Sequence, residues 1–159
     1  MIDELITQYG KRLYGLCITL CSHKFEADDL YQETWLKVFN KIDKYDKEKE
    51  FEPWLSRICI NIWKDLLRRK KLGMVFDNFS SPEEKEAVME KAAADEPKDY
   101  GELYDAIQTL PEKLRITVIL FYFRDMDIKQ TANVLKVPPG TVKSRLNKAR
   151  NLLKDILEF

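Results

Sequence analysis

Six polar and basic side chains between residues 143 and 150 could recognise nucleic acid. Lysine and arginine neutralise backbone phosphates, while serine, asparagine and lysine can also bond to base edges. From Lys136 to Lys154 the sequence has six basic residues and no acidic one. On a helix, Val142 and Leu146 would face a core and leave the polar set on the other side. That set is Lys143, Ser144, Arg145, Asn147, Lys148 and Arg150.

Basic surface helices are common, so the preceding segment decides between a plain solvated face and a DNA reader. Asp127 and Gln130 have the spacing of a capping box, in which each side chain bonds to the other residue's backbone N–H. Apolar residues at helical spacing follow, and Pro138 favours a break before the next helix. Two short helices joined by so short a turn predict a helix-turn-helix.

A second basic set lies between residues 57 and 68. Arg57, Asn61, Lys64 and Arg68 are spaced to lie on one side of a helix, where they could follow phosphates and read a base edge. Four aromatic residues lie nearby in the sequence and could either stack on unpaired bases or belong to the core: Tyr45, Phe51, Trp54 and Trp63.

An acidic set lies on the helix expected from about 26 to 42. Asp29, Gln32, Glu33 and Leu36 share a face opposite an apolar stripe. This face could be ordinary solvated surface, or it could bind a basic partner helix with Leu36 as the apolar anchor.

Metal and catalytic sites are weakly indicated. Cys17, Cys21 and His23 are close in sequence but lack an evident fourth ligand, and small buried cysteines explain the spacing equally well. Clustered carboxylates such as Asp28 and Asp29 would point in different directions on a helix. The sequence has neither a phosphate-binding glycine loop nor a pair of metal-binding histidines. We therefore expect a protein that is not an enzyme and that needs no cofactor or metal.

The expected elements are all helical. Apolar periodicity predicts helices over about 3–22, 26–42 and 51–71, with a Lys- and Glu-rich loop from 43 to 50. A further apolar helix from Leu114 to Phe123 is expected, and Thr109 with Glu112 resembles a second capping box. The predicted class is all-α, with two small helical domains at 1–72 and 99–159 and a flexible acidic linker at 73–98.

Charge follows the same division. The chain has 27 basic and 27 acidic residues, but the net charge is +2 over 1–72, −6 over 73–102 and +4 over 103–159. Two basic modules around an acidic connector favour a polyanionic partner. Because no apolar run approaches the roughly 18 residues of a membrane span, and no signal peptide is visible, we expect a cytoplasmic protein without membrane insertion.

Together these motifs resemble the extracytoplasmic-function (ECF) sigma factors of bacterial RNA polymerase. Four stretches carry the resemblance in order and spacing: EADDLYQETW at 26–35, FEPWLSRICINIWKDLLRRKK at 51–71, LPEKLRITVILFYF at 110–123 and VPPGTVKSRLNKARNLL at 137–153.

The resemblance implies a role for each set of residues. Asp29, Gln32, Glu33 and Leu36 would dock on the clamp helices of the polymerase β′ subunit, and the β subunit would also be contacted. The loop 43–52 and the second basic set, from Arg57 to Arg68, would open and read the minus-ten promoter element. The set at 143–150 would read the minus-thirty-five element. An anti-sigma factor, often membrane-bound, commonly covers these surfaces in the family.

Two other functions compete with this interpretation. A stand-alone helix-turn-helix regulator would use only the C-terminal module and would not need the acidic face. A small helical metalloenzyme or nuclease would require bound metal.

Overall fold

The computed structural model describes residues 2–76 and 101–157. The chain divides into two compact units, residues 1–96 and 97–159. All regular elements among the described residues are helical, and no strand occurs in those two ranges. The predicted all-α class with two helical domains is confirmed.

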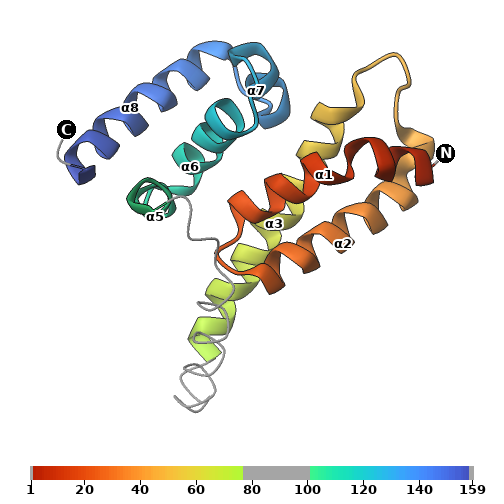
Figure 1. Ribbon diagram of the computed structural model, residues 1–159, viewed down its shortest axis with the longest axis horizontal. Helices are drawn as coiled ribbons and strands as arrows, with labels where there is room; N and C mark the ends of the chain where they lie inside the picture. The colour runs from red at the N-terminus through yellow and green to blue at the C-terminus, as the bar shows by residue number, and fades with distance from the viewer. Residues whose placement is uncertain (1, 77–100, 158–159) are drawn as a thin grey trace. The chain divides into compact units, whose positions relative to one another are not determined.

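The first unit is a bundle of three long helices (Figure 1). They are α1 (Ile2–Leu20), α2 (Lys24–Lys41) and α3 (Phe51–Phe76), and the 3-10 turn η1 (Ile42–Lys44) follows α2 directly. A loop from residue 45 to 50 then leads into α3 at the end of the bundle where α1 begins. Because α3 extends to Phe76, the first four residues of the expected linker are helical, and residues 77–98 of it lie outside the described residues.

Helix α2 contacts both other helices of the bundle, which widens the arc of its surface that is buried. Ala27, Thr34 and Val38 lie on the side of α2 opposite the acidic face and are buried, as expected of that side. Leu30 lies at the edge of this side and is fully buried too. The hydroxyl of Thr34 donates to the Leu30 carbonyl at 2.6 Å, so this buried polar group is satisfied.

A close approach of α1 to α2 explains one glycine inside α1. A Cβ at Gly10 would lie 3.0 Å from the Tyr31 hydroxyl, tighter than ordinary van der Waals contact. Gly10 therefore allows Tyr31 to pack against α1, where its ring meets that of Tyr14 edge-on at 5.5 Å.

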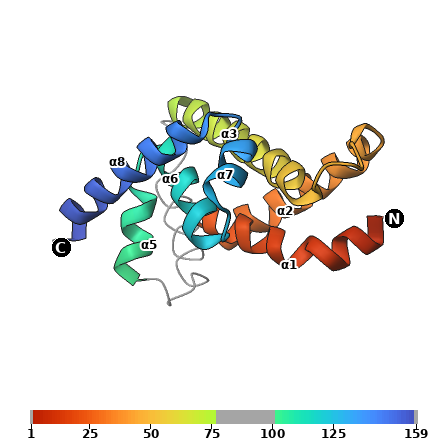
Figure 2. The ribbon, with the colours of Figure 1, turned by 90° about the horizontal axis from the view of Figure 1, so that it is seen from above.

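The second unit contains α5 (Gly101–Gln108), α6 (Glu112–Val118), the π-helical turn η3 (Ile119–Phe123), α7 (Ile128–Leu135) and α8 (Pro139–Leu157). Helix α8 packs against α5, α6 and α7, and Figure 2 shows it as the long helix of this unit. Its contact with α7 across a three-residue turn is the expected helix-turn-helix.

The two capping boxes read from the sequence have different outcomes. At α7 the prediction is confirmed: Gln130 N–H donates to Asp127 Oδ1 at 2.7 Å, and Asp127 N–H donates to Gln130 Oε1 at 3.0 Å. At α6 it is wrong, because Pro111 is the N-cap. The Thr109 hydroxyl instead donates backwards to the Ala106 carbonyl at 2.6 Å, at the end of α5.

Candidate nucleic-acid and protein interfaces

Helix α8 separates its apolar and polar residues on opposite sides. Val142, Leu146 and Ala149 are buried at 0%, 2% and 0% exposure and fix the helix to the unit. Of the predicted DNA-contacting residues, Arg145 is half-buried and the other five are exposed: Lys143, Ser144, Asn147, Lys148 and Arg150. The helix therefore presents hydrogen-bonding and cationic side chains outward, as a major-groove reader must.

The turn before α8 depends on one strained backbone position. Lys136, the residue after α7, has φ 55° and ψ 47°, in the left-handed region. Val137 N–H donates to the Ala132 carbonyl at 3.1 Å, which satisfies a carbonyl of the last turn. Helix α7 thus ends at Leu135, and the left-handed Lys136 ends it two residues before Pro138.

Arg150 has a partner that sequence spacing did not indicate. Its Nε donates to the Tyr122 hydroxyl at 2.7 Å, and its guanidinium carbon lies 5.7 Å from the centre of the Tyr122 ring. Tyr122 belongs to η3, so two residues 28 apart in the chain meet on an exposed surface.

The second basic set lies along one side of α3, as its spacing predicts. Asn61 and Arg68 are exposed, while Arg57 and Lys64 are half-buried. Arg68 also lies 3.2 Å from an Asp65 carboxylate oxygen. Because both partners are largely exposed, this ion pair contributes little and leaves Arg68 able to exchange it for a phosphate.

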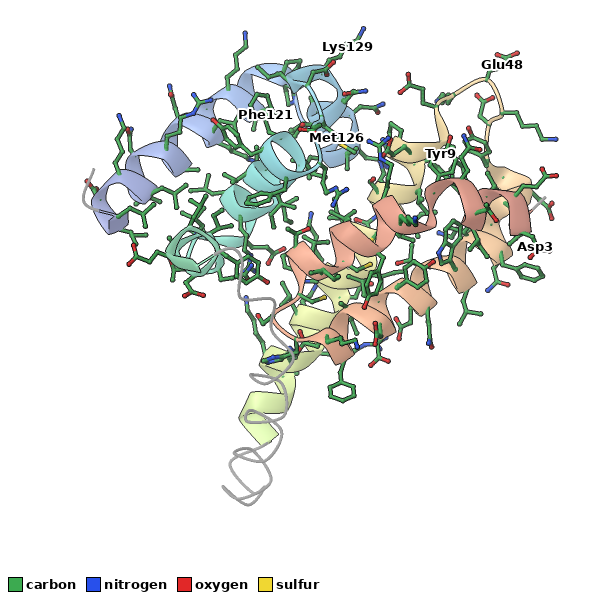
Figure 3. The ribbon with its side chains drawn as sticks, in the orientation of Figure 1. Asp3, Tyr9, Glu48, Phe121, Met126 and Lys129 are labelled. Atoms are coloured by element: carbon green, nitrogen blue, oxygen red, sulfur yellow. The ribbon has the colours of Figure 1, made fainter. Side chains whose placement is uncertain are left out.

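The four aromatic residues near this set divide into core and surface. Phe51 and Trp63 are only 6% and 3% exposed, so the hypothesis that they stack on bases is wrong for both rings. Tyr45 and Trp54 are half-buried, with ring centroids 5.0 Å apart. The Tyr45 hydroxyl donates to the Lys49 carbonyl, and desolvation raises the Tyr45 pKa above its usual value. Tyr45 begins the loop 45–50, in which Glu48 is exposed (Figure 3), and Trp54 lies in the first turn of α3 after that loop.

The predicted acidic face of α2 is intact and exposed. Asp29, Gln32, Glu33 and Leu36 are all on the surface, and Leu36 is 64% exposed. Phe39, at 65% exposure, lies one turn beyond Leu36 on the same side. Sequence reasoning missed Phe39, although its spacing of three from Leu36 was visible.

Grooves between α2 and α3 border this face. One of about 460 Å³ is lined by Glu33 and Leu36 from α2 together with Arg69 from α3. A second of about 310 Å³ includes Asp29 and Lys70. Lys70 forms an ion pair with Glu26, so it ties α3 to α2, and burial lowers the Lys70 pKa.

The three cysteines are part of the hydrophobic core. Cys17, Cys21 and Cys59 are all buried, and the Cys17 and Cys59 sulfurs lie 3.8 Å apart across α1 and α3. Within residues 2–76 and 101–157, no three His, Cys, Asp or Glu side chains come together as metal ligands would. None of the helices described in these ranges is long and apolar enough to cross a membrane.

Two family models match the two units. Sigma-70 region 2 matches residues 5–72, and Sigma-70 region 4 matches residues 100–153. Among similar curated proteins, the ECF RNA polymerase sigma factor SigW of Bacillus subtilis is 29% identical, covering 95% of this chain and 86% of its own. SigE of Mycolicibacterium smegmatis is 30% identical over 98% of this chain and 61% of its own.

Solved structures share the fold. The sigma factor RpoE of Bartonella quintana, crystallised with the anti-sigma factor NepR, matches with a TM-score of 0.78 at 22% identity, over 98% of this chain and 96% of its own. CnrH, solved in complex with the cytosolic domain of CnrY, matches with a TM-score of 0.72 at 22% identity, over 99% of this chain and 87% of its own.

Proposed function

Because the chain belongs to the ECF sigma factors, which bind core RNA polymerase and direct it to promoters, we propose that three of its surfaces divide this work. The acidic face of α2 binds polymerase, the basic side of α3 with its neighbouring loop acts on the minus-ten element, and α8 reads the minus-thirty-five element. We propose domain boundaries at 1–72 and 99–159 with a connecting segment at 73–98.

One observation carries the proposal: a single chain exposes both a cationic recognition helix and a separate acidic face with apolar anchors. A stand-alone regulator has a use for the first surface only. The second surface combines acids that suit a basic helix with Leu36 and Phe39, which are 64% and 65% exposed and offer apolar contact.

The clamp helices of the β′ subunit are the proposed partner of α2. Asp29 and Glu33 would pair with basic side chains, Gln32 would add a hydrogen bond, and Leu36 would enter an apolar pocket. The adjacent groove lined by Glu33 and Leu36 leaves room for side chains of a docked helix. Contact with the polymerase β subunit stays a prediction.

We assign the minus-ten element to α3 because this helix combines a row of polar and basic side chains with two partly exposed aromatic rings near its start. Arg57, Lys64 and Arg68 would follow the phosphates, and Asn61 would contact a base. Tyr45 and Trp54 can stack on bases separated from the duplex, since stacking needs a ring face and no paired partner.

We extend the proposal to regulation and location. The chain acts in the cytoplasm without catalytic chemistry of its own, and an anti-sigma factor holds it inactive by covering these polymerase- and DNA-binding surfaces. The two similar structures are themselves complexes with an anti-sigma factor or a cytosolic partner domain, which supports this.

Run-off transcription with core polymerase and a promoter library tests the function directly. We expect transcripts only when the chain is added, from promoters that share two spaced elements. A chain that binds a DNA element yet gives no transcript would indicate the stand-alone regulator instead.

The docking surface has its own test by charge reversal. Asp29→Lys with Glu33→Lys should weaken capture of core polymerase by about a hundredfold or more, since each of the two lost charge pairs at a protein interface costs about 1.5 kcal/mol or more. Asp3→Lys with Glu4→Lys makes the same change in net charge at the exposed start of α1 and serves as the control (Figure 3). Equal capture of both variants would rule out the α2 face.

A further inference from the structure

Tyr122 lies outside the helix-turn-helix and yet contacts one of the proposed DNA-binding side chains. Its phenol oxygen accepts a hydrogen bond from Arg150 Nε at 2.7 Å, and its ring lies 5.7 Å from the Arg150 guanidinium carbon. Two different interactions, a hydrogen bond and a cation–π contact, thus act on one arginine. Tyr122 is 48% exposed, so its side chain lies at the surface and is not part of the buried core.

The Tyr122 ring has a packing partner of its own. Its neighbour Phe121 meets it edge-on with centroids 5.0 Å apart, and the chain there forms the π-helical turn η3, which contacts α6 and α7. Figure 3 shows Phe121 on η3 within the second unit. The tyrosine thus extends from a helical turn that belongs to the packed unit, while the arginine side chain by itself would sample many rotamers.

The geometry leaves Arg150 able to bind an anion. A guanidinium has five N–H donors, and the bond to Tyr122 uses the single one on Nε. The two terminal amino groups remain to form the paired hydrogen bonds that arginine makes to phosphate. Ordering a flexible arginine before binding reduces the conformational entropy that is lost when the complex forms.

We propose that Tyr122 is a positioning residue for DNA recognition, which holds Arg150 so that its terminal amino groups meet a backbone phosphate beside the minus-thirty-five element. This rests on the proposed function of α8 and adds a residue that lies outside the helix-turn-helix α7–α8.

The test measures promoter affinity across salt concentrations, with holoenzyme assembled from the full chain and core polymerase. The probe is a promoter fragment selected in the transcription experiment. Tyr122→Phe keeps the ring and removes only the hydroxyl, so we expect affinity to fall about threefold to tenfold, the range of one ordinary hydrogen bond, because this bond lies on an exposed surface. Tyr122→Leu removes the ring as well and should lose more.

A double-mutant cycle separates positioning from a merely structural role. Arg150→Ala should weaken binding and lower the salt slope by about one phosphate contact. In that background Tyr122→Phe should change affinity less than about twofold, because the partner is already gone. Full additivity of the two changes, unchanged affinity of Tyr122→Phe, or tighter binding by it would each overturn the proposal.

Two controls distinguish this failure from failure of the proposed function. Melting temperatures of the variants check the fold, and Lys148→Ala tests α8 independently of Tyr122. If Lys148→Ala and Arg150→Ala both leave affinity and salt slope unchanged, the function assigned to α8 is wrong. If those two weaken binding and Tyr122→Phe does not, only the role of Tyr122 is wrong.

Discussion

At the scale of single residues, the three cysteines show how an environment removes reactivity. Cys17 and Cys59 are fully buried with sulfurs 3.8 Å apart, and Cys21 is 4% exposed. The contact with Cys59 and burial raise the Cys17 pKa, and burial raises the Cys21 pKa to about 12. Since the thiolate is the nucleophile, raised pKa values and lack of access both slow modification.

Thiol labelling checks this. At about pH 8 the folded chain should react with a disulfide reagent roughly a thousandfold more slowly than the denatured chain, because even Cys21 loses about a factor of ten in thiolate for each unit by which its pKa is raised. After denaturation all three thiols should react. Rapid labelling of any cysteine in the folded chain would contradict the buried arrangement.

At the scale of elements, two local features define the ends of the first helix of the helix-turn-helix. The capping box of Asp127 and Gln130 starts α7, and the left-handed Lys136 ends it. Both lie before α8, so both help to set the direction in which the recognition helix leaves the turn.

Asp127→Ala should destabilise the second unit. Loss of an N-cap side chain costs about 1 kcal/mol, which lowers the melting temperature of so small a unit by about 4–8 °C. Thr109→Ala is the matched control, because Thr109 has the sequence pattern of a cap but bonds backwards to Ala106. Similar losses from both substitutions would show that the effect of Asp127 is not capping.

Lys136→Gly should act in the opposite direction. A non-glycine residue in the left-handed region costs roughly 1 kcal/mol, and glycine removes that strain. We expect a higher melting temperature by a few degrees, whereas Lys136→Ala removes the charge and keeps the strain. If Lys136→Ala stabilised the chain as much as Lys136→Gly, charge rather than backbone strain would be responsible.

These elements also show what the sequence could predict. Helix faces followed from apolar spacing, so the exposure of Asp29 and Lys148 and the burial of Val142 were predictable. The burial of Leu30 was not predicted. A single apolar stripe describes the contact of α2 with one helix, whereas α2 packs on both α1 and α3. Thr109 was misassigned because a capping pattern does not specify the local backbone. The Tyr122–Arg150 contact joins residues 28 apart, which helical periodicity cannot bring together.

At the scale of the whole molecule, the net charge of the chain does not describe how charge is distributed along it. The chain is neutral overall, yet residues 103–159 have a net charge of +4 and residues 73–102 a net charge of −6. A net charge of zero would suggest weak attraction to DNA at long range. Counterion release, however, depends on the number of phosphates actually contacted, and in the proposed function the exposed cations of α8 supply part of that number.

Two variants with the same net charge separate these effects. Lys143→Ala with Lys148→Ala removes two exposed cations from α8, whereas Lys24→Ala with Lys113→Ala removes two exposed cations elsewhere. The first pair should lower the slope of log affinity against log salt by about 1.8, as expected for two phosphate contacts, and should weaken promoter binding by the holoenzyme. The second pair should leave the slope near that of the unmodified chain. If both pairs reduced the slope equally, overall charge would control binding, and the local cationic face of α8 would lose its assigned role.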